Sequence, residues 1–211
     1  LFLMTAALHV IPEQDVQTFP GISFRLPGSV MNDETFFEFC QLNPELRIER
    51  DAEKTIFIMP PTTSETGNRN AKLTIKVGIW NEQRQLGEVF DSSTGFKLPN
   101  GAERSPDVSW ISKDRWEALT SAERNHFAPI APDFVLELRS KDQSLAHLKK
   151  KMEEYIAVGC RMGWLVDPKG RKTFVYTENG DIQTVSFEDT LSGGEVLPGF
   201  ELRLADLFKT G

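Results

Sequence analysis

The sequence predicts a single α/β domain in which a central mixed sheet, much of it antiparallel, is flanked by helices. Two observations favour this class. Amphipathic helical segments alternate with short apolar runs bounded by turn residues, and several of those runs are close enough in the chain to form hairpins. The chain has 211 residues, of which 39% are hydrophobic and 26% charged, as in globular domains. We expect an N-terminal extension over 1–30, a core over 31–180 and a β-rich tail over 181–211.

In the first half of the chain, segments with the apolar spacing of helices alternate with segments that have the spacing of strands. The expected elements are a helix at 32–42 with Asn32 or Asp33 as its N-cap, strands at 47–51 and 55–59, a helix at 64–84, and strand-like segments at 87–98 and 105–111. Pro60 and Pro61 end the second strand. Leu73, Val77 and Trp80 recur at helical spacing and support the long helix. The run Pro99-Asn100-Gly101 is a hairpin signal.

The second half continues this alternation. Two short polar segments that contain tryptophan fall within 113–125. They are followed by a buried strand at 134–138, a helix at 144–158, strands at 162–166 and 173–176, and turn-bounded segments around Gly193 and Pro198. Gly159 is expected to terminate the helix because glycine accepts the left-handed conformation found at helix C-termini.

The formal net charge of −7 is distributed unevenly. Residues 1–60 carry a net −5, residues 61–180 a net +2, and residues 181–211 a net −4. The segment 139–151 alone carries +4. The overall acidity argues against a protein that coats nucleic acid nonspecifically, but it leaves room for a basic cleft.

The N-terminus and the cysteines favour a cytoplasmic setting. The apolar stretch at 1–10 is too short to span a bilayer and lacks a charged leader, so no signal peptide is expected. Met4 is a candidate for the natural first residue. Cys40 and Cys160 form no CxxC motif and cannot supply a disulfide framework.

Motifs for several common chemistries are absent from the sequence. It contains no phosphate-binding GxxxxGK[ST], no GxGxxG, no HExxH and no GxSxG. His9, His126 and His147 are scattered, which disfavours a histidine metal site. Any bound metal is therefore expected to use carboxylates, which suit hard cations such as Mg²⁺ or Mn²⁺.

Two carboxylates lie within apolar strand sequence. Asp107 stands at the start of one predicted strand and Glu137 near the end of another. A buried ionised carboxylate is unfavourable unless it is paired or binds a metal, so two on neighbouring strand ends can share one cation. The alternatives are that Asp107 is a turn residue after Pro106, and that Glu137 faces solvent or pairs with Arg139.

Lys151 and Glu65 lie on the two long predicted helices. At ~100° per residue, the apolar stripe of the helix at 144–158 is flanked by Lys149 and Lys151, and Lys151 lies on the side of Tyr155. A flanking lysine can extend over the edge of the core into a cleft; alternatively, it belongs to a solvated basic face. Glu65 is in a first helical turn, where an acid usually complements the helix dipole.

Taken in order, these segments resemble a known family. The matching segments are Ile-Met-Pro-Pro-Thr-Thr-Ser-Glu65, the Gly87 to Gly101 segment, Ser-Pro-Asp107, Pro-Asp-Phe-Val-Leu-Glu137-Leu-Arg-Ser, Leu-Lys-Lys-Lys151-Met-Glu-Glu-Tyr155, and Gly159 to Pro168. They are similar to the bacterial "putative restriction endonuclease" family of the PD-(D/E)xK nuclease superfamily. The resemblance covers about residues 30–205 and implies a restriction-endonuclease-like core.

The resemblance also implies roles for single residues. Asp107 and Glu137 match the metal-binding acids of the motif, and Glu65 matches an acid on the first core helix that helps to bind the metal. Residue 139 is Arg where the motif has Lys, and Lys151 on the following helix matches the displaced lysine. Arg stays charged at neutral pH and cannot carry a proton, but Arg139, with Lys149, can hold a substrate phosphate.

The function implied is a Mg²⁺- or Mn²⁺-dependent DNA endonuclease. A carboxylate-bound Mg²⁺ makes a water nucleophilic and stabilises charge on the phosphate, and a nearby lysine orients the water. A homodimer is expected because two copies related by a twofold axis cut both strands most simply. The alternative is a nuclease-fold module that binds nucleic acid or protein with little or no cleavage, which the net acidity and Arg139 favour; a third is a purely structural domain.

Overall fold

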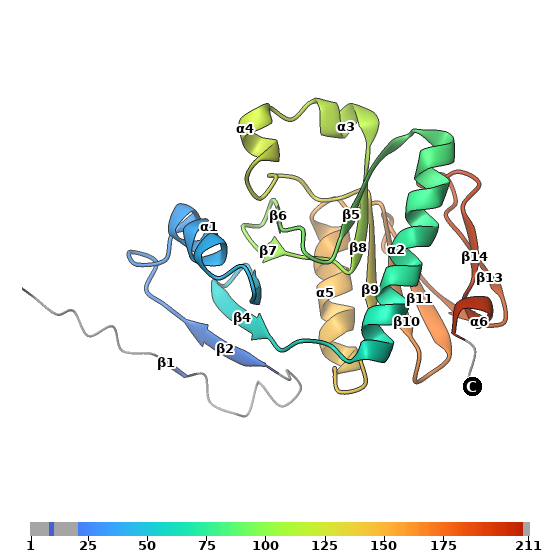
Figure 1. Cartoon of the computed structure of the whole chain (residues 1–211), viewed down its shortest axis with the longest axis horizontal. Helices are drawn as coiled ribbons and strands as arrows, with labels where there is room; N and C mark the ends of the chain where they lie inside the picture. The colour runs from blue at the N-terminus through green and yellow to red at the C-terminus, as the bar shows by residue number, and fades with distance from the viewer. Residues whose placement is uncertain (1–8, 11–20, 209–211) are drawn as a thin grey trace, which may run out of the picture.

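The computed structural model describes residues 9–10 and 21–208 of the chain (Figure 1). The expectations for residues 1–8, including Met4 as the first residue, lie outside the described residues, as do most of the expected N-terminal extension and the last three residues. None of the helices in the described part of the chain is long and apolar enough to cross a membrane.

A six-stranded mixed sheet forms the centre of the molecule. Its strand order is β12-β11-β10-β9-β8-β5, comprising Ile182–Ser186, Lys172–Thr177, Met162–Asp167, Phe134–Leu138, Val108–Ser112 and Gly87–Asp91. Only β9 and β10 pair in parallel, and the other neighbours in this sheet are antiparallel. The predicted fold class, a mixed sheet flanked by helices with many antiparallel pairs, is confirmed.

Helices cover both faces of this central sheet. On one face α2 (Ser64–Arg84) buries Leu73, Val77 and Trp80 against the strands. The C-terminal segment, with β13 (Thr190–Ser192), β14 (Glu201–Arg203) and α6 (Leu204–Leu207), completes that layer. On the opposite face lies α5 (Leu145–Ala157), as Figure 1 shows.

Both long helices begin and end within one residue of the bounds expected from the sequence. The Thr63 side chain caps the N-terminus of α2, and the Ser144 side chain caps that of α5. Gly159 follows the C-cap of α5 at a φ of 104°, a conformation that favours glycine. The chain can therefore turn directly from α5 into β10, which places the helix over its neighbouring strands.

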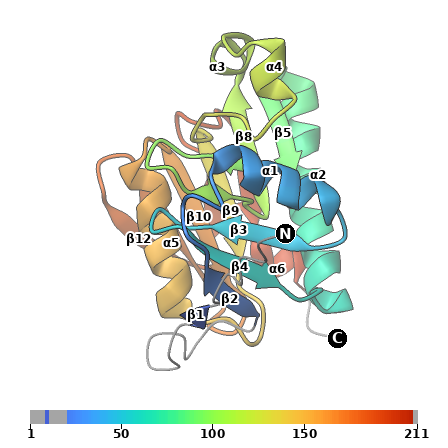
Figure 2. The ribbon, with the colours of Figure 1, turned by 90° about the vertical axis from the view of Figure 1, so that its left-hand side faces the viewer.

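A second six-stranded sheet lies beside α5 and is seen from the front in Figure 2. Its order is β1-β2-β4-β3-β7-β6, comprising His9–Val10, Ile22–Arg25, Thr55–Met59, Arg47–Arg50, Glu103–Arg104 and Phe96–Lys97. Helix α1 (Asp33–Leu42), capped by Asn32, packs Phe36 against Ile48 and Ile56 of this sheet. The predicted helix at 32–42 and the strands at 47–51 and 55–59 are thereby confirmed.

The segment at 87–98 differs from the expectation of one strand-like stretch. β5 ends at Asp91, whose carboxylate accepts hydrogen bonds from the backbone and hydroxyl of Ser93. This turn redirects the chain, so β6 joins the second sheet and pairs with β7 across the predicted Pro99 hairpin. The polar segments at 113–125 form two short helices, α3 (Lys113–Glu117) and α4 (Ser121–Arg124).

A buried ion-pair cluster fastens α1 to the second sheet. The guanidinium of Arg50 is fully buried and donates from Nε to Glu103 at 2.8 Å and from its two Nη atoms to Glu103, Asp33 and the Met31 carbonyl. It also lies 4.4 Å from the centre of the Phe36 ring. A forked arrangement of this kind satisfies the buried charge and fixes β3 relative to β7.

Gly87 allows β5 to lie against β8, and this gives a test of the sheet. A Cβ at Gly87 would lie 2.0 Å from the Ile111 carbonyl oxygen and 2.7 Å from the Trp110 ring, so the backbone would have to shift. We expect Gly87→Ala to lower the free energy of unfolding by roughly 2 kcal/mol or more. Chemical denaturation measures this change.

The matched control is Gly78→Ala within α2. Nothing lies within 4 Å of a Cβ at Gly78, and alanine has the higher helix propensity, so we expect stabilisation by about 0.5–1 kcal/mol. Equal effects of the two substitutions would contradict the close packing of β5 on β8.

Candidate functional site

The site lies between the two sheets, where the central pair β8–β9 meets β3 and α5. Val108 pairs with Leu136 in the antiparallel register of β8 and β9. One position further along, Asp107 therefore falls opposite Glu137. The backbone N–H of Leu138 donates to Asp107 Oδ2 at 2.8 Å and fixes the Asp107 carboxylate at this position.

Asp107 is only 8% exposed and accepts two further hydrogen bonds. Arg47 of β3 donates from Nη2 to Asp107 Oδ1 at 3.0 Å and also to the Ser105 carbonyl. Asn70 of α2 donates from Nδ2 to the same Asp107 oxygen at 3.4 Å. Asp107 is therefore a convergence point for β3, α2 and β9.

Glu137 is 3% exposed in a strand that is buried throughout. Tyr155 of α5 donates its hydroxyl to Glu137 Oε1 at 3.1 Å, and Lys151 Nζ lies 2.8 Å from the same oxygen. The alternatives in which Glu137 faces solvent or pairs with Arg139 are wrong, because β9 is an inner strand between β8 and β10 and both of its faces are covered.

Lys151 is 7% exposed and turns inward from α5. Its ammonium lies 2.8 Å from Glu137 and 2.8 Å from Glu49 of β3. The alternative of a solvated basic face is therefore wrong for this lysine. The structure brings Asp107, Glu137 and Lys151 together as the sequence analysis predicted, although their catalytic roles remain predictions.

The remaining predicted residues are placed elsewhere. Glu65 is exposed, and its carboxylate pairs with Arg69 one helical turn away. Arg139 donates to Asp167 at 3.0 Å and to the Gln143 carbonyl at 3.0 Å. Lys149 places its ammonium 4.1 Å from the centre of the Phe174 ring. The expected phosphate-binding role of Arg139 and Lys149 stays a prediction.

Within the part of the chain that the structure describes, no three His, Cys, Asp or Glu side chains form a metal-binding group. The predicted triple of Asp107, Glu137 and Glu65 is therefore not assembled. The oxygen donors at the site nevertheless fit a hard divalent cation. Each carboxylate has about four lone-pair positions, and Asn70 Oδ1, on the amide that contacts Asp107, is buried and finds no hydrogen-bond partner among the described residues.

Burial and neighbouring charges separate the two acids that hold Lys151. Burial raises the pKa of Glu137 to about 7. The charge of Lys151 opposes this rise, and the carboxylates of Asp107 and Glu49 add to it. Burial acts in the same direction on Glu49, but the charges of Lys151 and Arg104 outweigh it and lower the pKa of Glu49 to about 2. The two acids are thus shifted in opposite directions: the lowered pKa of Glu49 keeps it ionised beside Lys151, whereas the raised pKa of Glu137 favours its protonated form.

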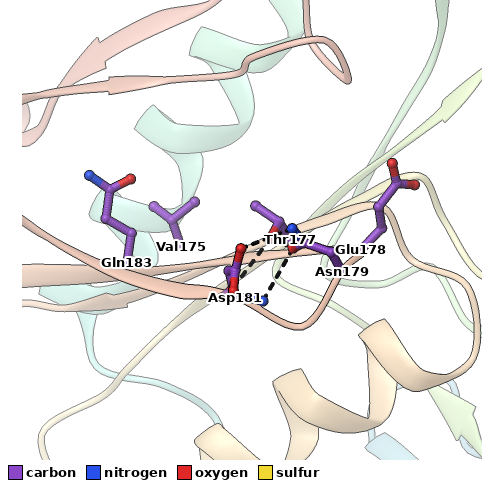
Figure 3. A pocket seen from close by; sticks show the side chains of 6 residues that line it. All are labelled: Val175, Thr177, Glu178, Asn179, Asp181 and Gln183. Carbon is purple, nitrogen blue, oxygen red and sulfur yellow. Dashed lines mark hydrogen bonds between the residues drawn. The ribbon is translucent and has the colours of Figure 1, made fainter.

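A separate pocket on the β11–β12 hairpin contains none of these residues. It has a volume of about 360 Å³ and is lined by Val175, Thr177, Glu178, Asn179, Asp181 and Gln183 (Figure 3). Thr177, Asn179 and Asp181 hydrogen-bond to one another across the turn. The side chains of these three residues find their hydrogen-bond partners within the hairpin. The buried titratable groups of the candidate site lie elsewhere, between the two sheets.

Comparison with known proteins agrees with this architecture. Residues 33–205 match Uma2, a family described as "Putative restriction endonuclease". The chain belongs to the Uma2 family. The resemblance found in the sequence is confirmed, and the family supports a nuclease-like function. No curated protein matches the chain.

A solved structure shares the fold of this Uma2 protein. It is the crystal structure of a putative nuclease belonging to DUF820 from Anabaena variabilis, which is 20% identical in sequence and has a TM-score of 0.66. The match covers 76% of this chain and 89% of the other chain. This similarity confirms the restriction-endonuclease-like core.

The sequence analysis did not identify several residues that complete the site, namely Arg47, Glu49, Asn70 and Arg104. One signal was present. Arg47 and Glu49 are two positions apart in a predicted strand and so share one face. Opposite charges on one face of a strand next to Ile48 suggest a buried ion-pair network, but the sequence does not indicate its partners.

The raised pKa of Glu137 predicts how stability depends on pH without divalent metal. Between about pH 4.5 and pH 7 the folded protein keeps a proton on Glu137 that the unfolded chain has lost, so stability falls as pH rises through this window. We expect a loss of about 1–3 kcal/mol, measured by chemical denaturation in EDTA.

Glu137→Gln removes this dependence, because a neutral amide resembles the protonated acid. The matched control, Glu88→Gln at an exposed position of β5, is expected to retain the pH dependence of the wild type. An unchanged decline in the Glu137→Gln protein would show that another group titrates. The lowered pKa of Glu49 acts in a different window, and its contribution is lost only as pH falls from about 4.5 to about 2.

Proposed function

We propose that this Uma2 protein is a Mg²⁺- or Mn²⁺-dependent endodeoxyribonuclease that hydrolyses phosphodiester bonds. The observation that carries the proposal is the convergence of Asp107, Glu137 and the Lys151 ammonium at one buried point between the sheets. The residue types are those that phosphodiester hydrolysis needs. The family and the shared fold support a nuclease, and the metal and the DNA substrate are our proposal.

The carboxylates of Asp107 and Glu137, with the amide oxygen of Asn70, would hold the cation. A divalent cation bound there supplies Lewis acidity and lowers the pKa of a bound water. In this proposal Asp107 is kept in place by Arg47 and by the Leu138 N–H, so its carboxylate needs little reorganisation when it binds. Preorganised groups of this kind are more effective than groups that must move during the reaction.

Lys151 has the positive charge that the reaction requires beside Glu137. An ammonium at this position orients the attacking water and stabilises the negative charge that develops on the phosphate. Arg139 cannot replace it, because its guanidinium is engaged with Asp167 and the Gln143 carbonyl. We therefore assign the lysine function of the motif to Lys151.

A second candidate function is nucleic-acid or protein binding without cleavage. One observation favours it, namely that Arg47 already pairs with Asp107 at 3.0 Å and so competes with a metal for that carboxylate. In this case the protein would bind DNA with an affinity that falls as salt rises, and no divalent metal would produce cleavage.

Plasmid cleavage tests the proposal. Supercoiled DNA incubated with purified protein and Mg²⁺ or Mn²⁺ is expected to become nicked or linear, and the ratio of linear to nicked product reports whether both strands are cut together. Asp107→Asn and Glu137→Gln are each expected to reduce the rate by roughly 100-fold or more, because each removes an anionic ligand.

Matched substitutions control for surface and charge effects. Asp189→Asn and Glu88→Gln make the same chemical changes at exposed positions and are expected to keep the wild-type rate. Cleavage that persists in both Asp107→Asn and Glu137→Gln would exclude this site. DNA binding without cleavage under either metal would favour the second candidate function.

A further inference from the structure

Glu49 reaches the site from a different sheet than Asp107 and Glu137. It lies on β3, is 4% exposed, and accepts from Lys151 Nζ at 2.8 Å and from the Ser105 N–H at 3.2 Å on the same oxygen. Its other oxygen accepts from Arg104 at 3.4 Å. One carboxylate thereby contacts α5, the strand β7 and the segment that leads to Asp107.

Lys151 has a long side chain that needs partners to hold a single position. A lysine side chain loses up to about 2 kcal/mol of rotamer entropy when it is fixed, and Glu137 alone contacts its ammonium from one side only. Glu49 contacts the ammonium from the second sheet at the same distance of 2.8 Å. The two carboxylates together fix the direction in which Lys151 extends from α5.

A second chain of contacts leads from Glu49 to the same helix. Arg104 pairs with Glu49 and also with Glu154 of α5 at 2.7 Å. Glu49 therefore contacts α5 directly through Lys151 and indirectly through Arg104. Its hydrogen bond with the backbone N–H of Ser105 ties the carboxylate to the chain two positions before Asp107. Glu49 therefore links the position of Lys151 to the segment that carries the metal-binding acid.

We propose that Glu49 is a positioning residue that holds the Lys151 ammonium beside Glu137 in the catalytic arrangement. This inference rests on the proposed nuclease function. It assigns a role in the reaction to the second sheet, because β3 carries the residue that orients the lysine.

Steady-state cleavage by Glu49→Gln, Lys151→Met and the double variant tests the inference. Glu49→Gln is expected to lower kcat by about 10–100-fold, as for loss of one oriented electrostatic contact, with KM for DNA nearly unchanged. In the Lys151→Met background it is expected to have no further effect, because Glu49 acts through the missing ammonium. Additive losses would overturn the proposal, as would a Glu49→Gln protein with the wild-type kcat.

Glu103→Gln is the matched control for stability. Glu103 is also 4% exposed, lies on the same sheet and pairs with a buried arginine, Arg50, but it does not contact Lys151. Both substitutions are expected to lower the melting temperature, and only Glu49→Gln is expected to lower kcat per folded molecule. If Glu49→Gln fails to fold, Glu49→Asp keeps the charge with a shorter reach and is expected to show a smaller, equally non-additive loss.

Nitrogen-15 NMR of lysine ammonium groups provides a measurement that does not require cleavage. A buried, ion-paired ammonium exchanges its protons slowly, and the Lys151 signal is assigned by its absence in Lys151→Met. We expect this signal in the wild type and in Glu103→Gln, and its loss or broadening in Glu49→Gln or Glu49→Asp. A wild type that shows the signal but no cleavage would contradict the nuclease function, whereas persistence of the signal without Glu49 would contradict the positioning role.

Discussion

The buried ammonium of Lys151, between the carboxylates of Glu49 and Glu137, is the interaction on which the site depends. A charge in the protein interior is strongly unfavourable unless it is paired and hydrogen-bonded. The pairing requires α5, β9 of the central sheet and β3 of the second sheet to meet at one point. Misplacement of any one of these elements would leave a buried charge unpaired, so folding and assembly of the site are coupled.

The second sheet is attached through polar contacts as well as apolar ones. Among the described residues, its apolar cluster centres on three buried side chains, Phe36, Ile48 and Ile56, whereas the two faces of the central sheet bury much larger clusters. The partly buried ion pair of Arg47 with Asp107 and the pairs of Arg104 with Glu154 and of Glu49 with Lys151 add directional contacts to the central sheet and to α5. Bidentate and charge-assisted hydrogen bonds fix orientation more strictly than apolar packing, and accurate orientation is what a catalytic site needs.

The sequence predicted most of the elements because their signals are local. The helix at 64–84 and the strand at 134–138 have the predicted bounds, since caps, periodicity and flanking proline determine them within a few residues. The segment at 87–98 was predicted less well, because the turn at Asp91 depends on a side chain that caps its own backbone. Tertiary packing then decides which of the two sheets each half of this segment joins.

The site was only partly predictable, for the same reason. Asp107 and Glu137 are conspicuous because a carboxylate within an apolar strand needs an explanation. Lys151 was identified by resemblance, because its local pattern alone favoured a solvated position. Glu49 lies 102 residues from Lys151 in the chain, and no periodicity connects two positions so distant. Glu65 has the expected residue type on the expected helix, but it is on the exposed side and pairs with Arg69.

The charge balance of the cluster connects its stability with its proposed chemistry. Asp107, Glu49 and Glu137 share a buried site with several cationic side chains. Glu137 is the acid whose pKa rises, to about 7, because burial and the other two carboxylates oppose its ionisation. A proton on Glu137 and a divalent cation beside it relieve the same repulsion, so they compete. Binding of a cation at Asp107 and Glu137 would then release the proton, and affinity for the metal would increase as pH rises toward and past neutrality. The arrangement that makes the metal-free protein less stable above neutral pH is thus the one that favours a cation there.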